Sequence, residues 1–144
     1  DTDPTSSVFY TGNASTTAGN TQDHIAYCFS PVKNFSAFGS YIGNGSTDGP
    51  FVHTGFRPAF VFMKSTSAVG GWRTYDSSRK TFNQINNSLH FNTTEDETAY
   101  ANDEIDFLSN GFKPRATGSF HNGNGTSYIF AAFAENPFKT ARAR

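Results

Sequence analysis

Cysteine, leucine and net charge are all scarce in this chain, and each shortage excludes a class of protein. Cys28 is the one cysteine among 144 residues, so the chain has neither an internal disulfide nor a zinc site built from cysteines. The 11 Lys and Arg residues are balanced by 12 Asp and Glu residues, and no basic cluster lies between the aromatic residues. Nucleic acid is therefore not an expected partner. No hydrophobic run has the length that crosses a bilayer, so we do not expect insertion into a membrane either.

Aromatic residues are the main apolar side chains. Phenylalanine occurs 16 times and tyrosine 6 times, whereas leucine occurs only at Leu89 and Leu108. Helix interiors are normally filled with Leu, Ala and Met, while aromatic and β-branched side chains suit pleated sheets. A chain of this length is large enough for a single domain with a sizeable core. We therefore predict one all-β domain over residues 1–144, with an aromatic-rich core and at most one short helix.

The stretch 41–64 is predicted to be the centre of the sheet. It holds two turns marked by glycine and proline, followed by an apolar run at residues 60–63 that has no helical spacing. Such a run is typical of a strand that is buried on both faces. The Asn-Gly pair at 110–111 favours a hairpin between residues 105–108 and 112–113. Other strands are predicted at residues 8–10, 24–29 (with Cys28 buried), 72–76, 88–92 and 128–134, and the acidic residues 95–104 are the one candidate for a helical turn.

Two segments near the ends of the chain share a local pattern. Gly19, Asn20, Ile25 and Phe29 recur with the same spacing as Gly123, Asn124, Ile129 and Phe133, and each copy is a polar loop that leads into a predicted strand. The match is either chance in a chain rich in these residues, or a sign that residues 1–39 end one repeat and residues 40–144 form a whole one. In the second case the strands of residues 1–39 are expected to pair with another copy, so that chains polymerise by strand donation.

Four segments carry a resemblance to a known family. They are GNGSTDGPFVHTGFRPAFVFMK at 43–64, WRTYDSSR at 72–79, IDFLSNGFK at 105–113 and YIFAAFAENPFK at 128–139. In this order they resemble a domain that recurs in tail-fibre-like and other virion proteins of marine bacteriophages, and residues 24–39 resemble the segment that precedes it. The resemblance implies an antiparallel β-sandwich, lectin-like and therefore of the jelly-roll or concanavalin type, on a phage particle. No activity of that family carries over to this chain.

A group of aromatic and polar residues is the candidate binding site for glycans. Trp72, Tyr75 and Tyr41 are predicted to form a platform on which sugar rings stack, with Arg73 and Asp76 supplying hydrogen bonds. Aromatic faces beside directional polar groups suit ligands that are rich in hydroxyl groups but partly apolar. The alternative is that Trp72 belongs to the core, as large rings do in a sheet this aromatic.

The acidic residues suggest a Ca²⁺ site or a remnant of a glycosidase. Asp48, Asp103, Glu104 and Asp106 offer the oxygen ligands that Ca²⁺ prefers, although their spacing is not that of an EF-hand and a solvated loop is the alternative. Glu104 and Asp106 also resemble the first two carboxylates of the E-x-D-x-E strand of retaining β-glucanases, but Leu108 stands where the acid/base is needed. A retaining glycosidase needs two carboxyl groups about 5 Å apart. Hydrolysis is therefore not expected, and no cofactor other than Ca²⁺ is predicted.

Together these observations predict a non-enzymatic structural protein of the virion surface, part of a tail fibre or another extracellular appendage. Its expected partners are other copies of itself in a homo-oligomer, neighbouring virion proteins and host-surface polysaccharide. The alternatives are a capsid decoration protein and, from a different class, a secreted carbohydrate-binding module or degenerate glucanase.

Overall fold

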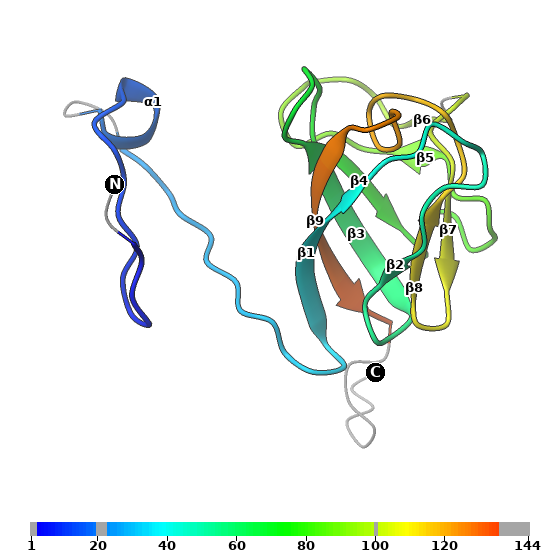
Figure 1. Cartoon of the computed structure of the whole chain (residues 1–144), viewed down its shortest axis with the longest axis horizontal. Coiled ribbons are helices and arrows are strands. Elements are labelled where there is room, and N and C mark those ends of the chain that lie inside the picture. The colour runs from blue at the N-terminus through cyan, green and yellow to red at the C-terminus, as the bar shows by residue number, and fades with distance from the viewer. Residues whose placement is uncertain (1–2, 20–22, 100, 136–144) are drawn as a thin grey trace.

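The computed structural model describes residues 3–19, 23–99 and 101–135, which form two distinct parts. The described residues from 36 to 135 make up a compact body of sheets, and the described residues before them form an arm whose start stands away from the body (Figure 1). We use "body" and "arm" for these two parts throughout. The one helix in the described ranges, α1 (Ser15–Ala18), has four residues and lies in the arm. No described helix has both the length and the apolar character that would cross a membrane.

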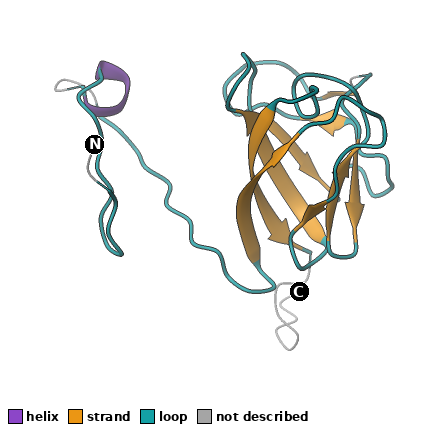
Figure 2. Ribbon diagram, in the orientation of Figure 1, coloured by secondary structure: helices purple, strands orange, loops and turns teal. Residues whose placement is uncertain are grey.

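The body is an antiparallel β-sandwich (Figure 2). Its four-stranded sheet has the order β1 (Ser36–Ile42), β9 (Ser127–Ala134), β3 (Pro58–Ser65) and β4 (Arg73–Asp76). Its three-stranded sheet has the order β2 (Val52–His53), β8 (Gly111–Pro114) and β7 (Ile105–Leu108), and β5 (Asn87–Ser88) pairs with β6 (Thr98–Ala99). The prediction of an all-β, aromatic-rich sandwich with at most one short helix is confirmed for the described residues.

The core lies between the two larger sheets. Successive residues on one strand face opposite sides of a sheet, so each strand contributes every second side chain to the core. The four-stranded sheet supplies Val61, Met63, Tyr75 and Phe130, and the three-stranded sheet supplies Val52, Phe107 and Phe112. The ring of Phe112 lies 5.2 Å from that of Phe130, so the two sheets pack directly against each other.

The predicted strand at residues 60–63 exists as part of β3, but only one of its faces is buried. Val61 and Met63 are fully buried, whereas Phe60 and Phe62 point to the other face and are half-buried. The prediction of burial on both faces is therefore wrong. The three-stranded sheet covers only one side of β3, and no described strand of the body lies over the other side.

The loops at one end of the sandwich meet at the side-chain amide of Asn122, which is fully buried. Its Nδ2 group donates hydrogen bonds to the carbonyl of Ser46 at 2.7 Å and to that of Ala116 at 2.8 Å. Its Oδ1 atom accepts a hydrogen bond from the backbone N–H of Asn44 at 3.0 Å. One polar side chain thus satisfies backbone groups of separate loops, which a buried amide requires.

Several local predictions have to be corrected. Residues 8–10 and 24–29 are not strands, and Cys28 is exposed rather than buried. Residues 95–99 and 101–104 contain the short strand β6 instead of a helical turn, and the strand predicted at 88–92 is reduced to β5. The physical reason for the first error is that a strand needs a neighbour to accept its backbone hydrogen bonds, and among the described residues neither 8–10 nor 24–29 pairs with another strand.

The other strand predictions hold. The hairpin of β7 and β8 turns at Ser109 and Asn110 as the Asn-Gly pair indicates. At Gly111 a Cβ atom would lie 2.2 Å from the carbonyl oxygen of Val52, so a side chain there would prevent β2 from pairing with β8. The final strand, β9, lies at the predicted place and pairs on both sides, with β1 and with β3.

Candidate functional site

The outer face of the four-stranded sheet carries a cluster of aromatic side chains, which we call the aromatic face. Strand register explains how it arises. Phe62 pairs with Ala131, which also pairs with Phe38, and Phe60 pairs with Phe133, so these side chains share the side opposite the core. Two residues from the loops beside β4 complete the cluster. Its members are Phe38, Phe60, Phe62, Trp72, Phe91, Ile129, Ala131 and Phe133.

The rings of the aromatic face pack against one another. The ring of Phe133 has its centre 5.9 Å from that of Phe38, 6.0 Å from that of Phe60 and 6.4 Å from that of Phe62. Phe62 in turn lies 5.6 Å from Trp72 and 5.3 Å from Phe91, both with edge-to-face geometry. These separations are those of favourable aromatic pairs. The cluster is therefore an ordered surface, although it lies outside the core.

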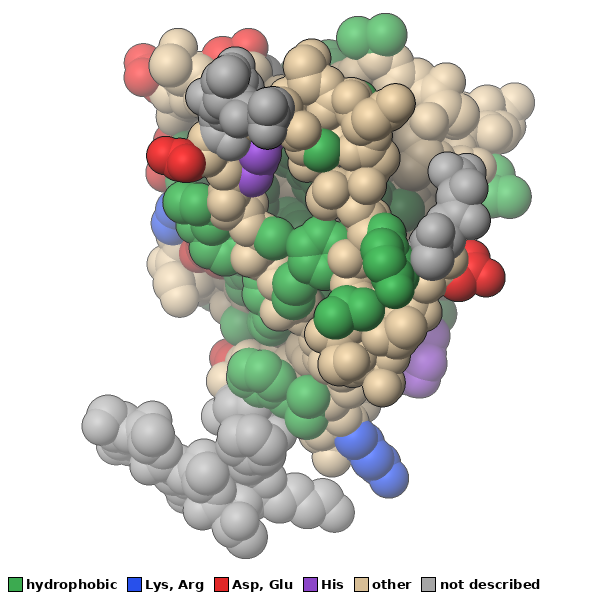
Figure 3. All heavy atoms as spheres, turned by 90° about the vertical axis from the view of Figure 1, so that its left-hand side faces the viewer, with side chains coloured by type: hydrophobic (Ala, Val, Ile, Leu, Met, Phe, Trp, Pro, Cys, Tyr) green, Lys and Arg blue, Asp and Glu red, His purple; other side chains and the backbone are tan. Residues whose placement is uncertain are grey.

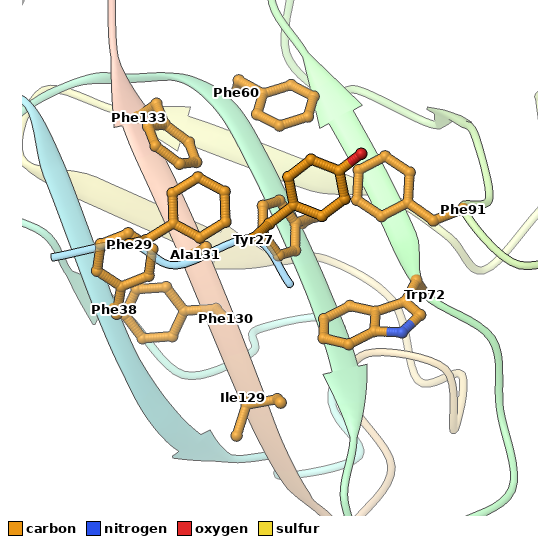
Figure 4. Close-up of a pocket in the computed structure, with 11 residues that line it drawn as sticks. Tyr27, Phe29, Phe38, Phe60, Trp72, Phe91, Ile129, Phe130, Ala131 and Phe133 are labelled. Carbon is orange, nitrogen blue, oxygen red and sulfur yellow. The ribbon is translucent and has the colours of Figure 1, made fainter. Parts of the chain in front are cut away.

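The arm crosses this face and partly covers it. The ring of Phe29 lies 5.7 Å from that of Phe38 and 5.8 Å from that of Phe133. Together with Tyr27 it roofs a cavity of about 950 Å³ above β9 and β3 (Figure 4). Hydrophobic side chains gather on the side of the molecule that contains this cavity (Figure 3). The cover is incomplete, because Tyr27 is 80% exposed and Phe91 59% exposed.

The structure does not bring the predicted glycan-binding residues to one surface. Trp72 lies on the aromatic face. Tyr75 points into the core and is fully buried, because successive residues along the strand face opposite sides of the sheet. Burial, followed by the charge of Asp103, raises the pKa of the Tyr75 phenol. The platform of three rings is therefore not formed.

The other members of that predicted site also have structural partners. Tyr41 points toward the core side and donates a hydrogen bond to the carbonyl of His121 at 2.7 Å, and burial raises the pKa of its phenol. Burial alone would raise the pKa of Asp76, but hydrogen bonds from the backbone and side chain of Arg79 outweigh it and hold that pKa below its usual value. Both side chains are thus engaged within the body.

A second cluster lies between the sheets, and we call it the buried polar cluster. It consists of Arg73, Ser88, Asp103 and His121, all at most 5% exposed. The Ser88 hydroxyl donates a hydrogen bond to Asp103 Oδ2 at 2.6 Å, and His121 Nδ1 lies 3.2 Å from Asp103 Oδ1. Arg73 Nε lies 3.7 Å from Asp103 Oδ2. Burial raises the pKa of Asp103, but His121, Ser88 and Arg73 together outweigh it and leave that pKa below its ordinary value.

The buried polar cluster contains the residue types of a hydrolase triad in an arrangement that does not suit one. A nucleophilic serine needs its hydroxyl beside a base that accepts the proton, usually histidine. Here the Ser88 hydroxyl is bound to Asp103, and all members are enclosed. The arrangement pairs a buried carboxylate with a guanidinium, so neither charge is left uncompensated in the interior. Sequence reasoning selected Arg73 and Asp103 for other roles and missed Ser88 and His121, whose isolated positions carry no motif.

The four predicted Ca²⁺ ligands do not form one ligand set, and the two that lie near each other, Asp48 and Asp106, are both paired with Arg115, at 3.2 and 3.3 Å. Asp48 is exposed and pairs with Lys113 at 2.5 Å, and the hydrogen bond and charge of Lys113 lower the pKa of Asp48. Asp106 Oδ2 lies 3.3 Å from Arg115 Nε, while Asp103 belongs to the buried polar cluster and Glu104 joins neither group. In the described part of the chain, no three His, Cys, Asp or Glu side chains come together as metal ligands do. Basic side chains stand where a cation would have to bind.

The fold and surface thus define an antiparallel β-sandwich with one closed core and one aromatic outer face. The sequence of residues 1–137 matches the family described as domain of unknown function DUF7483, and the chain belongs to that family. No curated protein and no solved structure gives a significant match.

Proposed function

We propose that this domain is a non-enzymatic structural module of a bacteriophage virion, located in a tail fibre or another surface appendage. The observation that carries the proposal is the aromatic face. Contiguous apolar surface on a folded domain usually marks a site where another protein binds, because water contact with so many rings is unfavourable. The location on a virion rests on the resemblance of residues 43–64, 72–79, 105–113 and 128–139 to phage virion proteins.

The chemistry of the aromatic face favours a protein partner over a sugar. A glycan site combines one or two stacking rings with several directional polar groups. Here six rings of the sheet and its loops adjoin one another, and the polar groups beside Trp72 are the ammonium of Lys64, 5.8 Å from the ring centre, and the amide of Asn92, which accepts a hydrogen bond from the backbone of Trp72. That ammonium also donates a hydrogen bond to the carbonyl of Gly70. In the proposed appendage, homo-oligomeric contacts and contacts with neighbouring virion proteins use this face.

The proposal is tested on purified particles of the phage that encodes the chain. An antibody raised against the body should label the tail or a surface appendage in electron micrographs, and mass spectrometry should detect the chain in the same particles. Label spread over the capsid would instead support a capsid decoration protein. Absence of the chain from particles that are otherwise complete would contradict the proposal.

Contact with host-surface polysaccharide is a second proposed role, because Trp72 lies at the margin of the aromatic face and is half-buried. Binding of the purified chain to a glycan array and to host cells measures it. Loss of binding in Trp72→Ala, with binding retained in the matched surface variant Phe82→Ala, would support a glycan contact. Phe82 is a suitable control because it is 78% exposed and is not part of the aromatic face. Equal binding by both variants would remove this role.

A further inference from the structure

The arm carries apolar side chains that its own body does not cover. Ile25, Tyr27 and Phe29 alternate along an extended segment and are 81%, 80% and 57% exposed. Alternate residues of an extended chain project to the same side, so the three form one apolar stripe. The residues between them, Ala26 and Cys28, are small. The segment therefore has the side-chain pattern of a strand with one face to bury, and most of that face is in water.

Little holds the arm in its present place. No backbone hydrogen bond joins residues 23–29 to another described residue, so the ring contacts of Phe29 are the main link to the body. A turn fixes where the arm leaves β1. There, the N–H of Ser36 donates to the carbonyl of Val32 at 2.9 Å, and the hydroxyl of Ser36 donates to the carbonyl of Ser30 at 3.1 Å. The segment before this turn is free to bind elsewhere without unfolding any strand.

The start of the arm lies away from its own body. In Figure 1 the residues around α1 stand clear of the sheets. No hydrogen bond or ring contact joins described residues 3–19 to the described part of the body. Val8, Phe9 and Tyr10 are each at least half exposed there. A second body is needed to cover them.

We infer that copies of this chain exchange arms, so that the stripe formed by Ile25, Tyr27 and Phe29 of one copy packs on the aromatic face of another. This inference names the partner for the surface in the proposed function and rests on that proposal. Domain swapping of this kind reuses contacts that a chain already makes with itself, and only the connection at the hinge changes. The contacts of Phe29 with Phe38 and Phe133 show that the arm fits the face chemically.

The sequence of the arm explains why a second copy is the partner. Ile25 and Phe29 have the same spacing as Ile129 and Phe133, which are both members of the aromatic face on β9. The stripe therefore presents the same kinds of side chain at the same intervals as the surface that would receive it. The stripe therefore matches the apolar chemistry of the face on another copy, and exchanged arms reuse contacts of the kind that one chain makes with itself.

The surface involved is large enough for a stable complex. If six apolar arm residues each bury about 100 Å², reciprocal exchange of two arms removes roughly 2,400 Å² once the receiving faces are counted. Interfaces of that total area are typical of stable assemblies. The six residues are Val8, Phe9, Tyr10, Ile25, Tyr27 and Phe29.

The natural Cys28 allows a direct test, because it is exposed, single and located between Tyr27 and Phe29 of the stripe. Unlabelled chain and ¹⁵N-labelled chain are each modified at Cys28 with a benzophenone maleimide, mixed, equilibrated and irradiated. Cross-linked peptides from residues 36–65 and 127–135 are then analysed by mass spectrometry. Exchange predicts that about half of these cross-links join a light chain to a heavy chain, as random mixing of two equal populations requires. Light scattering of unmodified protein should show a dimer or a larger assembly at micromolar concentration.

Two variants complete the test. Tyr27→Ser combined with Phe29→Ser should weaken association by at least about 30-fold, the effect of losing an aromatic hot spot. Phe82→Ser should leave association unchanged, since it removes an exposed ring from a different surface. The circular dichroism spectrum of each variant checks that the body remains folded.

Two results would overturn the inference. The first is a monomer at all concentrations whose cross-links stay within one chain, which would leave the aromatic face for a different protein or a small apolar ligand. The second is an assembly whose cross-links also stay within one chain, because it would form through another surface. Both results leave the location of the chain on virus particles untouched, so the proposed function is judged separately by the labelling experiment.

Discussion

The two faces of the four-stranded sheet are built from similar side chains but have different environments. On β9, Phe130 points to the inner face and Phe133 to the outer one. The ring of Phe130 is enclosed by the three-stranded sheet and is 8% exposed, whereas Phe133 is half-buried among other rings of the aromatic face. Apolar composition alone therefore does not identify the core. The core is the face for which the chain also supplies a second layer.

This difference indicates where the body is complete and where it needs a partner. The inner face combines close packing with a buried ion pair between Arg73 and Asp103. The outer face has aromatic packing but no comparable layer above it, since the arm contributes only a few side chains. Interactions on the inner face are expected to determine stability, and those on the outer face to determine association.

The largest effect is expected for Phe130→Ala, which removes a ring from the closed face. Truncation of a buried phenylalanine costs its transfer free energy and leaves a cavity, so we expect the free energy of unfolding to fall by about 4 kcal/mol. Urea denaturation followed by tryptophan fluorescence of Trp72 measures this change. A loss below about 1 kcal/mol would mean that the inner face is not the stabilising one.

The next effect concerns the charge at the margin of the core. Asp103→Asn leaves the guanidinium of Arg73 without its buried counter-ion, so we expect a loss of about 3 kcal/mol at pH 7. The pKa of Asp103 is lower in the folded protein than in the unfolded chain, so its contribution is fully present above the unfolded pKa. It is lost as the pH falls through the folded pKa, that is, below about pH 4.

Denaturation curves between pH 2 and pH 7 check this dependence. The stability difference between the wild-type chain and Asp103→Asn should be constant above about pH 4 and should narrow below it. Ser88→Ala is a useful companion variant, because it removes one hydrogen bond to Asp103 but no charge. A difference that persists unchanged at pH 2 would show that the carboxylate does not stabilise the folded state through its charge.

The smallest effect on stability is expected for Phe133→Ala, the counterpart of Phe130→Ala on the same strand. Its ring is already partly in contact with water, so the free energy of unfolding should fall by only about 1 kcal/mol at dilute concentration. At concentrations where arms are exchanged, the same substitution should reduce association markedly. If Phe133→Ala lowers the free energy of unfolding of the dilute protein as much as Phe130→Ala does, the two faces of the sheet contribute equally to stability.

Sequence patterns predicted the body well where local chemistry decides the structure. The Asn-Gly pair at 110–111 gave the β7–β8 hairpin, and β-rich composition at 128–134 gave β9. The strand predicted at 72–76 also exists, as β4 at Arg73–Asp76. These features depend on residues that are adjacent or two apart in the chain, so a single sequence is enough to predict them.

The remaining features depend on contacts between distant segments. The apolar stripe of the arm has a strand pattern, but the pattern does not state whether a neighbouring strand exists to pair with it. Arg73, Asp103 and His121 come from three separate segments, and their meeting follows from the packing of the sheets rather than from any spacing. For the same reason the prediction of a glycan platform was wrong. The residue type of Tyr75 does not indicate whether its side chain points into the core or to the outer face.

The position of Asn122 limits how members of this family can vary. Its amide holds the backbone of residues 44, 46 and 116 at once, so a change in the length or path of one of these loops shifts the partners of the others. An insertion in one of these loops therefore disturbs the other two. The turn of the β7–β8 hairpin is tied in a simpler way, since the carbonyl of Asn110 accepts hydrogen bonds from the N–H groups of Thr54 at 3.0 Å and Gly55 at 3.1 Å, so a change there disturbs one neighbouring loop.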